Sequence, residues 1–166
     1  MKNIIVRKAE IGDLDSLLDI YNYEVVCGIS NLDLHKKDRK EWEVWFYAHN
    51  VENHPLYAAV LEGQVVGYAS LSPYRDKEAY CSTVELSIYV DVSHRRKGVA
   101  TALLNVLLED ARRDERTHMV ISVITSGNEA SQKLHETYGF SYCGTVHEAG
   151  FKHGKYRDID TYELMV

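Results

Sequence analysis

Three consecutive basic residues, Arg95, Arg96 and Lys97, precede Gly98 where an apolar strand pattern gives way to a helical one. The first turn of a helix has backbone N–H groups without intrahelical partners and carries a partial positive charge. A glycine there lets an anion approach the backbone closely, and the basic side chains add charge. The segment therefore predicts an anion-binding loop, although a basic triplet before a helix is also common in ordinary solvated loops.

Glu85, in the strand that precedes this loop, is another residue whose type is suited to catalysis. The segment alternates apolar with other residues, namely Val84, Leu86, Ile88 and Val90 against Glu85, Ser87 and Tyr89. Strict alternation predicts a strand over Thr83–Val92 with one buried face, which puts Glu85 on the opposite, polar face. A carboxylate in that place can accept a proton from a nucleophile, or can be an ordinary exposed strand residue.

The rest of the pattern predicts the elements that must position these residues. Further strands are expected at 3–8, 56–61, 64–71 and 118–125, with a tight turn at Glu62-Gly63. Helices are expected after the N-cap Asp13, at 39–49, at 98–113, and from the N-cap Asn128 to Gly139. Apolar residues on most sides of the 98–113 helix predict that it is largely buried. The order predicts a single domain, 1–166, with a mixed α/β (α+β) sheet.

Charge and cysteine content exclude several classes of function. The net charge of -6 and the pI near 5.7 disfavour a nucleic-acid or anionic-membrane surface. No signal peptide or membrane-length apolar run is present, so a cytoplasmic location is expected. Cys27, Cys81 and Cys143 form no CxxC pair and are expected to be reduced thiols. No metal is expected, because neither His-Glu pair has the second histidine of HExxH.

The segment Arg95–Ala100 reads R-x-x-G-x-A, which fits neither a Walker A loop nor the GxGxxG dinucleotide fingerprint. Following the strand ELSIYVD, it resembles the acetyl-CoA pyrophosphate loop of the GCN5-related N-acetyltransferases. Asn128, Ser131 and the Tyr138-Gly139-Phe140 ending resemble that family's second CoA-side motif. With the late AGFKHGKYRD segment, the chain is similar to the phosphinothricin and methionine-sulfone acetyltransferase branch over most of its length.

The resemblance implies a central sheet splayed at its middle, helices on both faces, and acetyl-CoA as co-substrate. It further implies that the strand glutamate, Glu85, is the general base of a direct acetyl transfer, acting itself or through a water. Backbone N–H groups near Ile88–Val90 would polarise the acetyl carbonyl at a strand bulge. The cofactor-binding residues implied are Ile88, Tyr89, Val90, Arg95, Arg96, Lys97, Gly98, Val99, Ala100, Thr101, Asn128 and Ser131.

Two assignments stay open within the resemblance. Many relatives carry a general-acid tyrosine where this chain has His135, while phosphinothricin-type relatives share the histidine; Tyr138 is a nearby alternative phenol. For the acceptor, Arg75 is a candidate clamp for a carboxylate or phosphinate, helped by Tyr74, Thr83 and Glu85. The other interpretation of Arg75 is a loop salt bridge with Asp76.

The implied acceptor is the α-amino group of a methionine-sulfone-like, methionine-sulfoximine-like or phosphinothricin-like amino acid. A protein N-terminus, a polyamine or an aminoglycoside would use the same CoA half, and a sensor that binds acetyl-CoA without turnover is an alternative from another class. A covalent acetyl-cysteine route through Cys81 is disfavoured. Relatives of this branch also imply a homodimer, to which the aromatic C-terminal strands would contribute.

Overall fold

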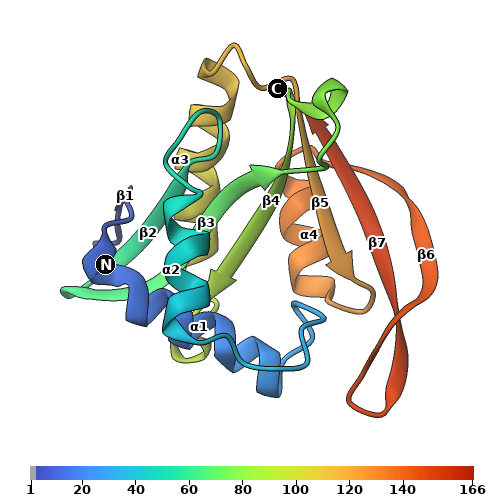
Figure 1. Cartoon of the computed structure of the whole chain (residues 1–166), viewed down its shortest axis with the longest axis horizontal. Coiled ribbons are helices and arrows are strands. Elements are labelled where there is room, and N and C mark those ends of the chain that lie inside the picture. Colours follow the sequence, from blue (N-terminus) through green and yellow to red (C-terminus); the bar gives the residue numbers. More distant parts are fainter. Residues whose placement is uncertain (1–2) are drawn as a thin grey trace.

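The computed structural model describes residues 3–166, which form a seven-stranded mixed sheet in the order β1-β2-β3-β4-β5-β7-β6. Helices α1 and α2 cover one face of this sheet, and α3 and α4 cover the other (Figure 1). The strands are β1 (Ile5–Lys8), β2 (Leu56–Leu61), β3 (Gln64–Pro73), β4 (Thr83–Val90), β5 (Met119–Thr125), β6 (Ser141–Lys152) and β7 (Lys155–Met165). The helices are α1 (Leu14–Cys27), α2 (Arg39–Tyr47), α3 (Val99–Arg113) and α4 (Glu129–Thr137).

The local signals act as expected at most boundaries. Glu62 and Gly63 both have positive φ, 52° and 81°, which is the conformation that a two-residue hairpin turn requires between β2 and β3. Asp38 and Glu41 form a capping box at the start of α2. The strand expected over 83–92 is shorter, because Asp91 accepts a hydrogen bond from the Ser93 backbone and starts a 3-10 turn.

Each face of the sheet has its own apolar core. The larger one packs α3 and the end of α4 against β2 to β5 and β7, and the smaller one packs α1 and α2 against β2 and β3. The expectation that α3 is buried on most sides is wrong: Leu103, Leu104, Leu107 and Leu108 are inaccessible, but the opposite face is exposed. None of the helices between residues 3 and 166 has both the length and the apolarity needed to cross a membrane.

The parallel strands β4 and β5 pair over only part of their length. Their register comprises three pairs, from Thr83↔Met119 to Glu85↔Ile121, after which β4 continues beside β3 and β5 beside β7. Figure 1 shows the two arrows drawing apart toward their C-terminal ends. The expected splay is therefore present. The β3–β4 register has no bulge, contrary to the resemblance, so the strands separate by divergence alone.

Gly67 of β3 lies in close contact with both β4 and α3. A Cβ there would lie 2.9 Å from the Tyr89 carbonyl oxygen and 3.0 Å from Val99 Cγ1. Gly67→Ala is expected to lower the free energy of unfolding by about 1–3 kcal/mol, measured by urea denaturation. Gly12→Ala is the matched control, because its Cβ would meet no atom within 4 Å. Equal stability of the two variants would show that this packing is looser than described.

Candidate functional site

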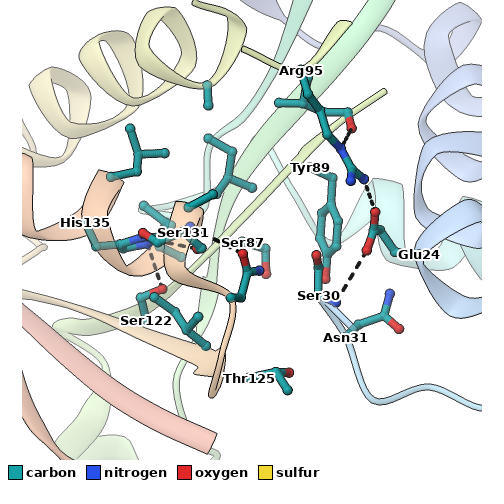
Figure 2. A pocket seen from close by; sticks show the side chains of 18 of the residues that line it. Glu24, Ser30, Asn31, Ser87, Tyr89, Arg95, Ser122, Thr125, Ser131 and His135 are labelled. Atoms are coloured by element: carbon teal, nitrogen blue, oxygen red, sulfur yellow. Dashed lines mark hydrogen bonds and ion pairs between the residues drawn. The ribbon is translucent and has the colours of Figure 1, made fainter. Parts of the chain in front are cut away.

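A cavity of about 880 Å³ lies where β4 and β5 diverge, and we call it the splay cavity. It is enclosed by β4, β5, the first turn of α3 and one side of α4, with the end of α1 and the loop after it at its far wall (Figure 2). The residues expected from the sequence that line it are Glu85, Ile88, Tyr89, Val90, Arg95, Arg96, Gly98, Val99, Ala100, Thr101, Asn128, Ser131 and His135.

The backbone of β4 presents unpaired groups to this cavity. The Asp91 N–H donates to the Val66 carbonyl, so Asp91 and every second residue before it direct their backbone groups toward β3. Ile88 and Val90 therefore face the opposite edge, where pairing with β5 has already ended. Tyr89 has its backbone turned to β3, so only its two neighbours can offer N–H groups to a ligand.

The start of α3 also faces the cavity with unpaired donors. Arg96 and Gly98 have φ of 58° and 84°, and this left-handed pair turns the chain sharply into the helix. A side chain at Gly98 would meet no atom within 4 Å, so the glycine is required for its backbone angle rather than for space. The first N–H to find an intrahelical acceptor is that of Ala102, bonded to Gly98. The N–H groups before it are available to an anion.

Glu24 of α1 is a buried carboxylate that the sequence reasoning missed. Its side chain is 4% exposed, forms an ion pair with Arg95, and accepts the Ser30 N–H at 3.4 Å (Figure 2). A Cβ on Gly28 would lie 1.8 Å from Glu24 Oε2, so this arrangement needs glycine at that position. Glu24 thus joins the basic loop before α3 to the loop after α1.

Lys152, the last residue of β6, also holds the loop that follows α1. Its Nζ is buried and donates to the carbonyl oxygens of Glu24 at 3.0 Å and Asn31 at 2.9 Å. Burial lowers the pKa of this ammonium group, while the carboxylates of Glu24 and Asp33 act in the opposite sense. The loop between α1 and α2 is therefore tied to the C-terminal hairpin.

His135 is 1% exposed and has both ring nitrogens occupied. Nδ1 donates to the Ser131 carbonyl at 2.7 Å, which leaves Nε2 to accept from the Ser122 hydroxyl at 2.9 Å. Burial lowers the pKa of His135, although the bond to Ser131 opposes this, so the neutral ring is favoured. Asn128 Oδ1 caps α4 by accepting the Ser131 N–H at 3.3 Å, and its amide nitrogen remains a donor.

Glu85 lies at the last paired position of β4 and β5. It makes no hydrogen bond or ion pair with any other side chain in residues 3–166. Burial raises the pKa of its carboxyl above the ordinary 4.5. A carboxylate with a raised pKa and no competing partner is suited to accept a proton from a bound group.

Several expected site residues lie outside the splay cavity. The Tyr138 hydroxyl donates to the Thr101 carbonyl at 2.9 Å and to Asn105 at 2.7 Å, which fastens α4 to α3. Lys97 does not line the cavity, and neither does Cys81, an exposed free thiol. The three cysteines are all free thiols, as expected.

Arg75, the expected clamp for the acceptor, also lies outside the splay cavity. The Arg75 side chain is exposed to solvent, and its guanidinium lies 4.9 Å from the ring centroid of Tyr74 and 5.5 Å from that of Tyr80. Within the described residues it forms no ion pair with Asp76. Thr83 begins β4 beside Met119, and neither Tyr74, Arg75 nor Thr83 lines the splay cavity or the second cavity described next.

A second cavity of about 500 Å³, the aromatic cavity, meets the first at Glu85, Ser87 and Tyr89. Figure 2 shows Tyr89 on the side of the splay cavity that faces Glu24 and Asn31. The other residues that line it come from α1, the following loop, α2 and β3, namely Tyr21, Asp33, Lys37, Glu41, Trp42, Trp45 and Tyr68. Glu85 therefore stands between two cavities, each able to hold one of two reactants.

A model of the acetyltransferase (GNAT) family matches residues 17–140. The chain belongs to the GNAT acetyltransferase family. The acetyltransferase is 35% identical to an L-methionine sulfoximine/L-methionine sulfone acetyltransferase of Pseudomonas paraeruginosa, covering 96% of this chain and 92% of the relative. It is also 35% identical to a phosphinothricin N-acetyltransferase of Streptomyces coelicolor, covering 95% and 94%.

A solved structure agrees with these relatives in family and fold. A phosphinothricin acetyltransferase of Sinorhizobium meliloti in complex with acetyl-CoA has a TM-score of 0.93 and 30% identity, covering 98% of this acetyltransferase and 88% of that chain. The family, the fold and the enzyme class that the sequence resemblance implied are therefore confirmed.

The residues that the sequence reasoning missed lie on elements with weak sequence signals. Ser122 and Thr125 line the splay cavity from β5, whose pattern revealed a strand but not the point of divergence. Glu24 stands in an otherwise apolar helix end, and this isolated charge was the available signal. Trp42 and Trp45 lie on α2, and the helical pattern over 39–49 does not show that their face borders a cavity.

Glu85→Gln is expected to raise the Tm at neutral and alkaline pH. Because burial raises the pKa of Glu85, the folded chain keeps this proton to higher pH than the unfolded chain, and stability falls as pH rises through that interval. Glutamine does not ionise, so the variant should exceed the wild type by roughly 1–4 °C at pH 8 and converge with it near pH 4. Thermal unfolding across this pH range measures the difference. A gap independent of pH would contradict burial as its cause.

Proposed function

We propose that the chain transfers the acetyl group of acetyl-CoA directly to the primary amine of a small amino-acid-like acceptor. The observation that carries the proposal is the position of Glu85 between the splay cavity and the aromatic cavity, with a raised carboxyl pKa and no hydrogen bond or ion pair to another side chain within residues 3–166. A donor in one cavity and an amine in the other would meet at this carboxylate.

The splay cavity suits the donor because its walls match the parts of acetyl-CoA. The pyrophosphate would lie at the free N–H groups of the first turn of α3, with Arg96 supplying positive charge, while the charge of Arg95 is balanced by its ion pair with Glu24. Ile88 and Val90 offer the unpaired strand edge on which an extended amide chain adds main-chain hydrogen bonds. Asn128 is a donor for the same chain from the opposite wall.

The reaction follows from these positions. Glu85 takes a proton from the ammonium group, directly or through a water, and the amine nitrogen then bonds to the acetyl carbonyl carbon. The unpaired N–H groups of Ile88 and Val90 stabilise the negative charge that develops on the carbonyl oxygen. The carbon–sulfur bond breaks, the nitrogen gives up its second proton to become the amide, and the thiolate takes up a proton as coenzyme A leaves, so that the proton released overall is the one held by Glu85.

We assign the leaving-group proton to the Ser122–His135 pair rather than to Tyr138. Ser122 lines the splay cavity and is hydrogen-bonded to Nε2 of His135, whereas Tyr138 does not line this cavity. The neutral His135 ring has no proton on Nε2 to give, so Nε2 orients the Ser122 hydroxyl, which passes a proton to the thiolate as it receives the second proton of the amine nitrogen.

Glu85→Gln tests the proposal through its kinetics. Thiol release from acetyl-CoA is measured with methionine sulfone, methionine sulfoximine, phosphinothricin, a polyamine, an aminoglycoside and a short peptide. The variant is expected to lose about 10²–10⁴-fold in kcat while its Kd for acetyl-CoA stays within about twofold of wild type. In the wild type, log kcat/KM should decrease as the pH is lowered. The apparent pKa of this decrease should lie above the ordinary carboxyl value.

Glu163→Gln is the matched control, because Glu163 is a half-buried strand carboxylate outside both cavities. Ser122→Ala should lower kcat without weakening acetyl-CoA binding. Tight acetyl-CoA binding without turnover of any amine would favour a sensor. Turnover confined to the polyamine, the aminoglycoside or the peptide would replace the amino-acid acceptor by that class.

A homodimer is part of the same proposal and is supported by the C-terminal hairpin. β6 is an edge strand, and Tyr142, Val146, Phe151 and Tyr156 on β6 and β7 are each more than half exposed. Apolar groups gathered on an edge hairpin suit a self-complementary interface. Sedimentation equilibrium should give twice the 19.0 kDa of one chain, and Phe151→Glu should give one chain.

A further inference from the structure

Arg95 is held by α1, although it belongs to the loop before α3. Its guanidinium forms an ion pair with Glu24, and its Cζ lies 5.9 Å from the ring centroid of Tyr23. Its Nε donates to the Val90 carbonyl oxygen at 3.4 Å, at the end of β4. Figure 2 shows the side chain extending toward Glu24, across the cavity from His135. In the described part of the chain, the polar contacts of the Arg95 side chain are therefore with α1 and β4.

The Glu24 carboxylate depends on this ion pair. The Glu24 side chain is 4% exposed, whereas that of Arg95 is 45% exposed. Nearby Lys152 directs its ammonium group to the carbonyl oxygens of Glu24 and Asn31 and to the Asn31 amide oxygen. Arg95 is thus the only side chain within residues 3–166 that forms an ion pair with Glu24. A buried carboxylate that loses its cation is strongly unfavourable, so a move of Arg95 to a phosphate would be opposed.

Arg96 differs from its neighbour in this respect. It lines the splay cavity from a left-handed position just before α3, and its side chain is exposed. Its guanidinium forms no hydrogen bond or ion pair within the described residues. His94 also lines the cavity, but its ring is hydrogen-bonded to Asp91. A pyrophosphate at the first turn of α3 therefore meets Arg96 uncommitted and Arg95 engaged.

The ion pair holds a wall that both cavities share. Glu24 also accepts the Ser30 N–H at 3.4 Å, so the pair joins the loop before α3 to the loop after α1. Residues 30–32 of the latter loop line the splay cavity, and Asp33, which follows, lines the aromatic cavity. A shift of this loop would change the space on both sides of Glu85. Because reacting groups must meet within a narrow range of distance and angle, such a shift would lower the rate of transfer.

We propose that Glu24 is a positioning residue for acetyl transfer: it withholds Arg95 from the pyrophosphate of the donor and commits it to the loop that borders both cavities. Arg95 begins the R-x-x-G-x-A loop, yet it then adds no net charge to donor binding. That charge comes from Arg96 and from the backbone N–H groups at the start of α3. The kinetic part of this inference rests on the proposed transfer at Glu85, whereas the binding part rests on the donor alone.

The affinity for coenzyme A, measured by isothermal titration calorimetry, tests the binding part without turnover. Glu24→Gln frees the Arg95 guanidinium, so it should tighten coenzyme A about threefold or more, and high salt should abolish this gain. The double variant Glu24→Gln/Arg95→Gln removes both charges and should stay within about twofold of the wild type. Arg96→Gln should weaken binding about tenfold. Asp19→Asn, which removes an exposed carboxylate from the same helix, is the matched control and should leave the affinity unchanged.

The value of kcat tests the positioning part with the same variants. Glu24→Gln and the double variant both break the ion pair, so each should lower kcat about tenfold and by the same factor. Glu24→Gln would then bind coenzyme A more tightly than the wild type and yet turn over more slowly. A merely loosened fold would weaken binding and turnover together. Asp19→Asn should keep the wild-type kcat.

Weaker binding of coenzyme A by Glu24→Gln, or a double variant that binds as weakly as Arg96→Gln, would overturn the withholding of Arg95. A double variant with the wild-type kcat would overturn the positioning role. If Glu24→Gln fails to fold, the double variant and Arg96→Gln still decide whether Arg95 contributes to binding. Absence of turnover with every amine would overturn the proposed function, while the affinities for coenzyme A would still decide the assignment of Arg95.

Discussion

The early end of pairing between β4 and β5 is the constraint on which the rest of the site depends. Two parallel strands that stay paired leave no backbone group free, whereas these separate after Glu85↔Ile121. The separation exposes the N–H groups of Ile88 and Val90, opens the splay cavity, and leaves Glu85 at the fork itself. The divergence is sustained because each strand keeps a full partner on its other side, β3 for β4 and β7 for β5.

Helix α3 and its preceding loop make use of this opening. The left-handed Arg96 and Gly98 end the 3-10 turn and aim the first turn of α3 at the cavity. Leu103, Leu104 and the leucines that follow anchor the helix beneath the sheet, so its N-terminus is held rigidly. A rigid set of donors needs little reorganisation when negative charge arrives, which is why such sites are built on buried helices.

Sequence patterns predicted the elements that follow local rules. The Glu62-Gly63 turn, the Asn128 cap and the R-x-x-G-x-A loop depend on backbone angles or helix ends that particular residues favour, so they were visible in the chain. The aromatic cavity was not, because its rings come from α1, α2, β3 and β4 and meet only after folding. Arg75 lies outside both cavities, and its charge alone could not indicate which part of the surface its loop faces.

The strand order has a consequence for how the protein is made. β7 follows β6 in the chain but lies between β5 and β6 in the sheet, so β6 cannot join the sheet until residues 155–165 have been synthesised. Lys152 is the last residue of β6, and its ammonium group donates hydrogen bonds to the carbonyl groups of Glu24 and Asn31. A nascent chain in which β7 is still missing therefore lacks the Lys152 bonds to the loop after α1, and that loop is held only by nearby bonds such as the one from the Ser30 N–H to Glu24.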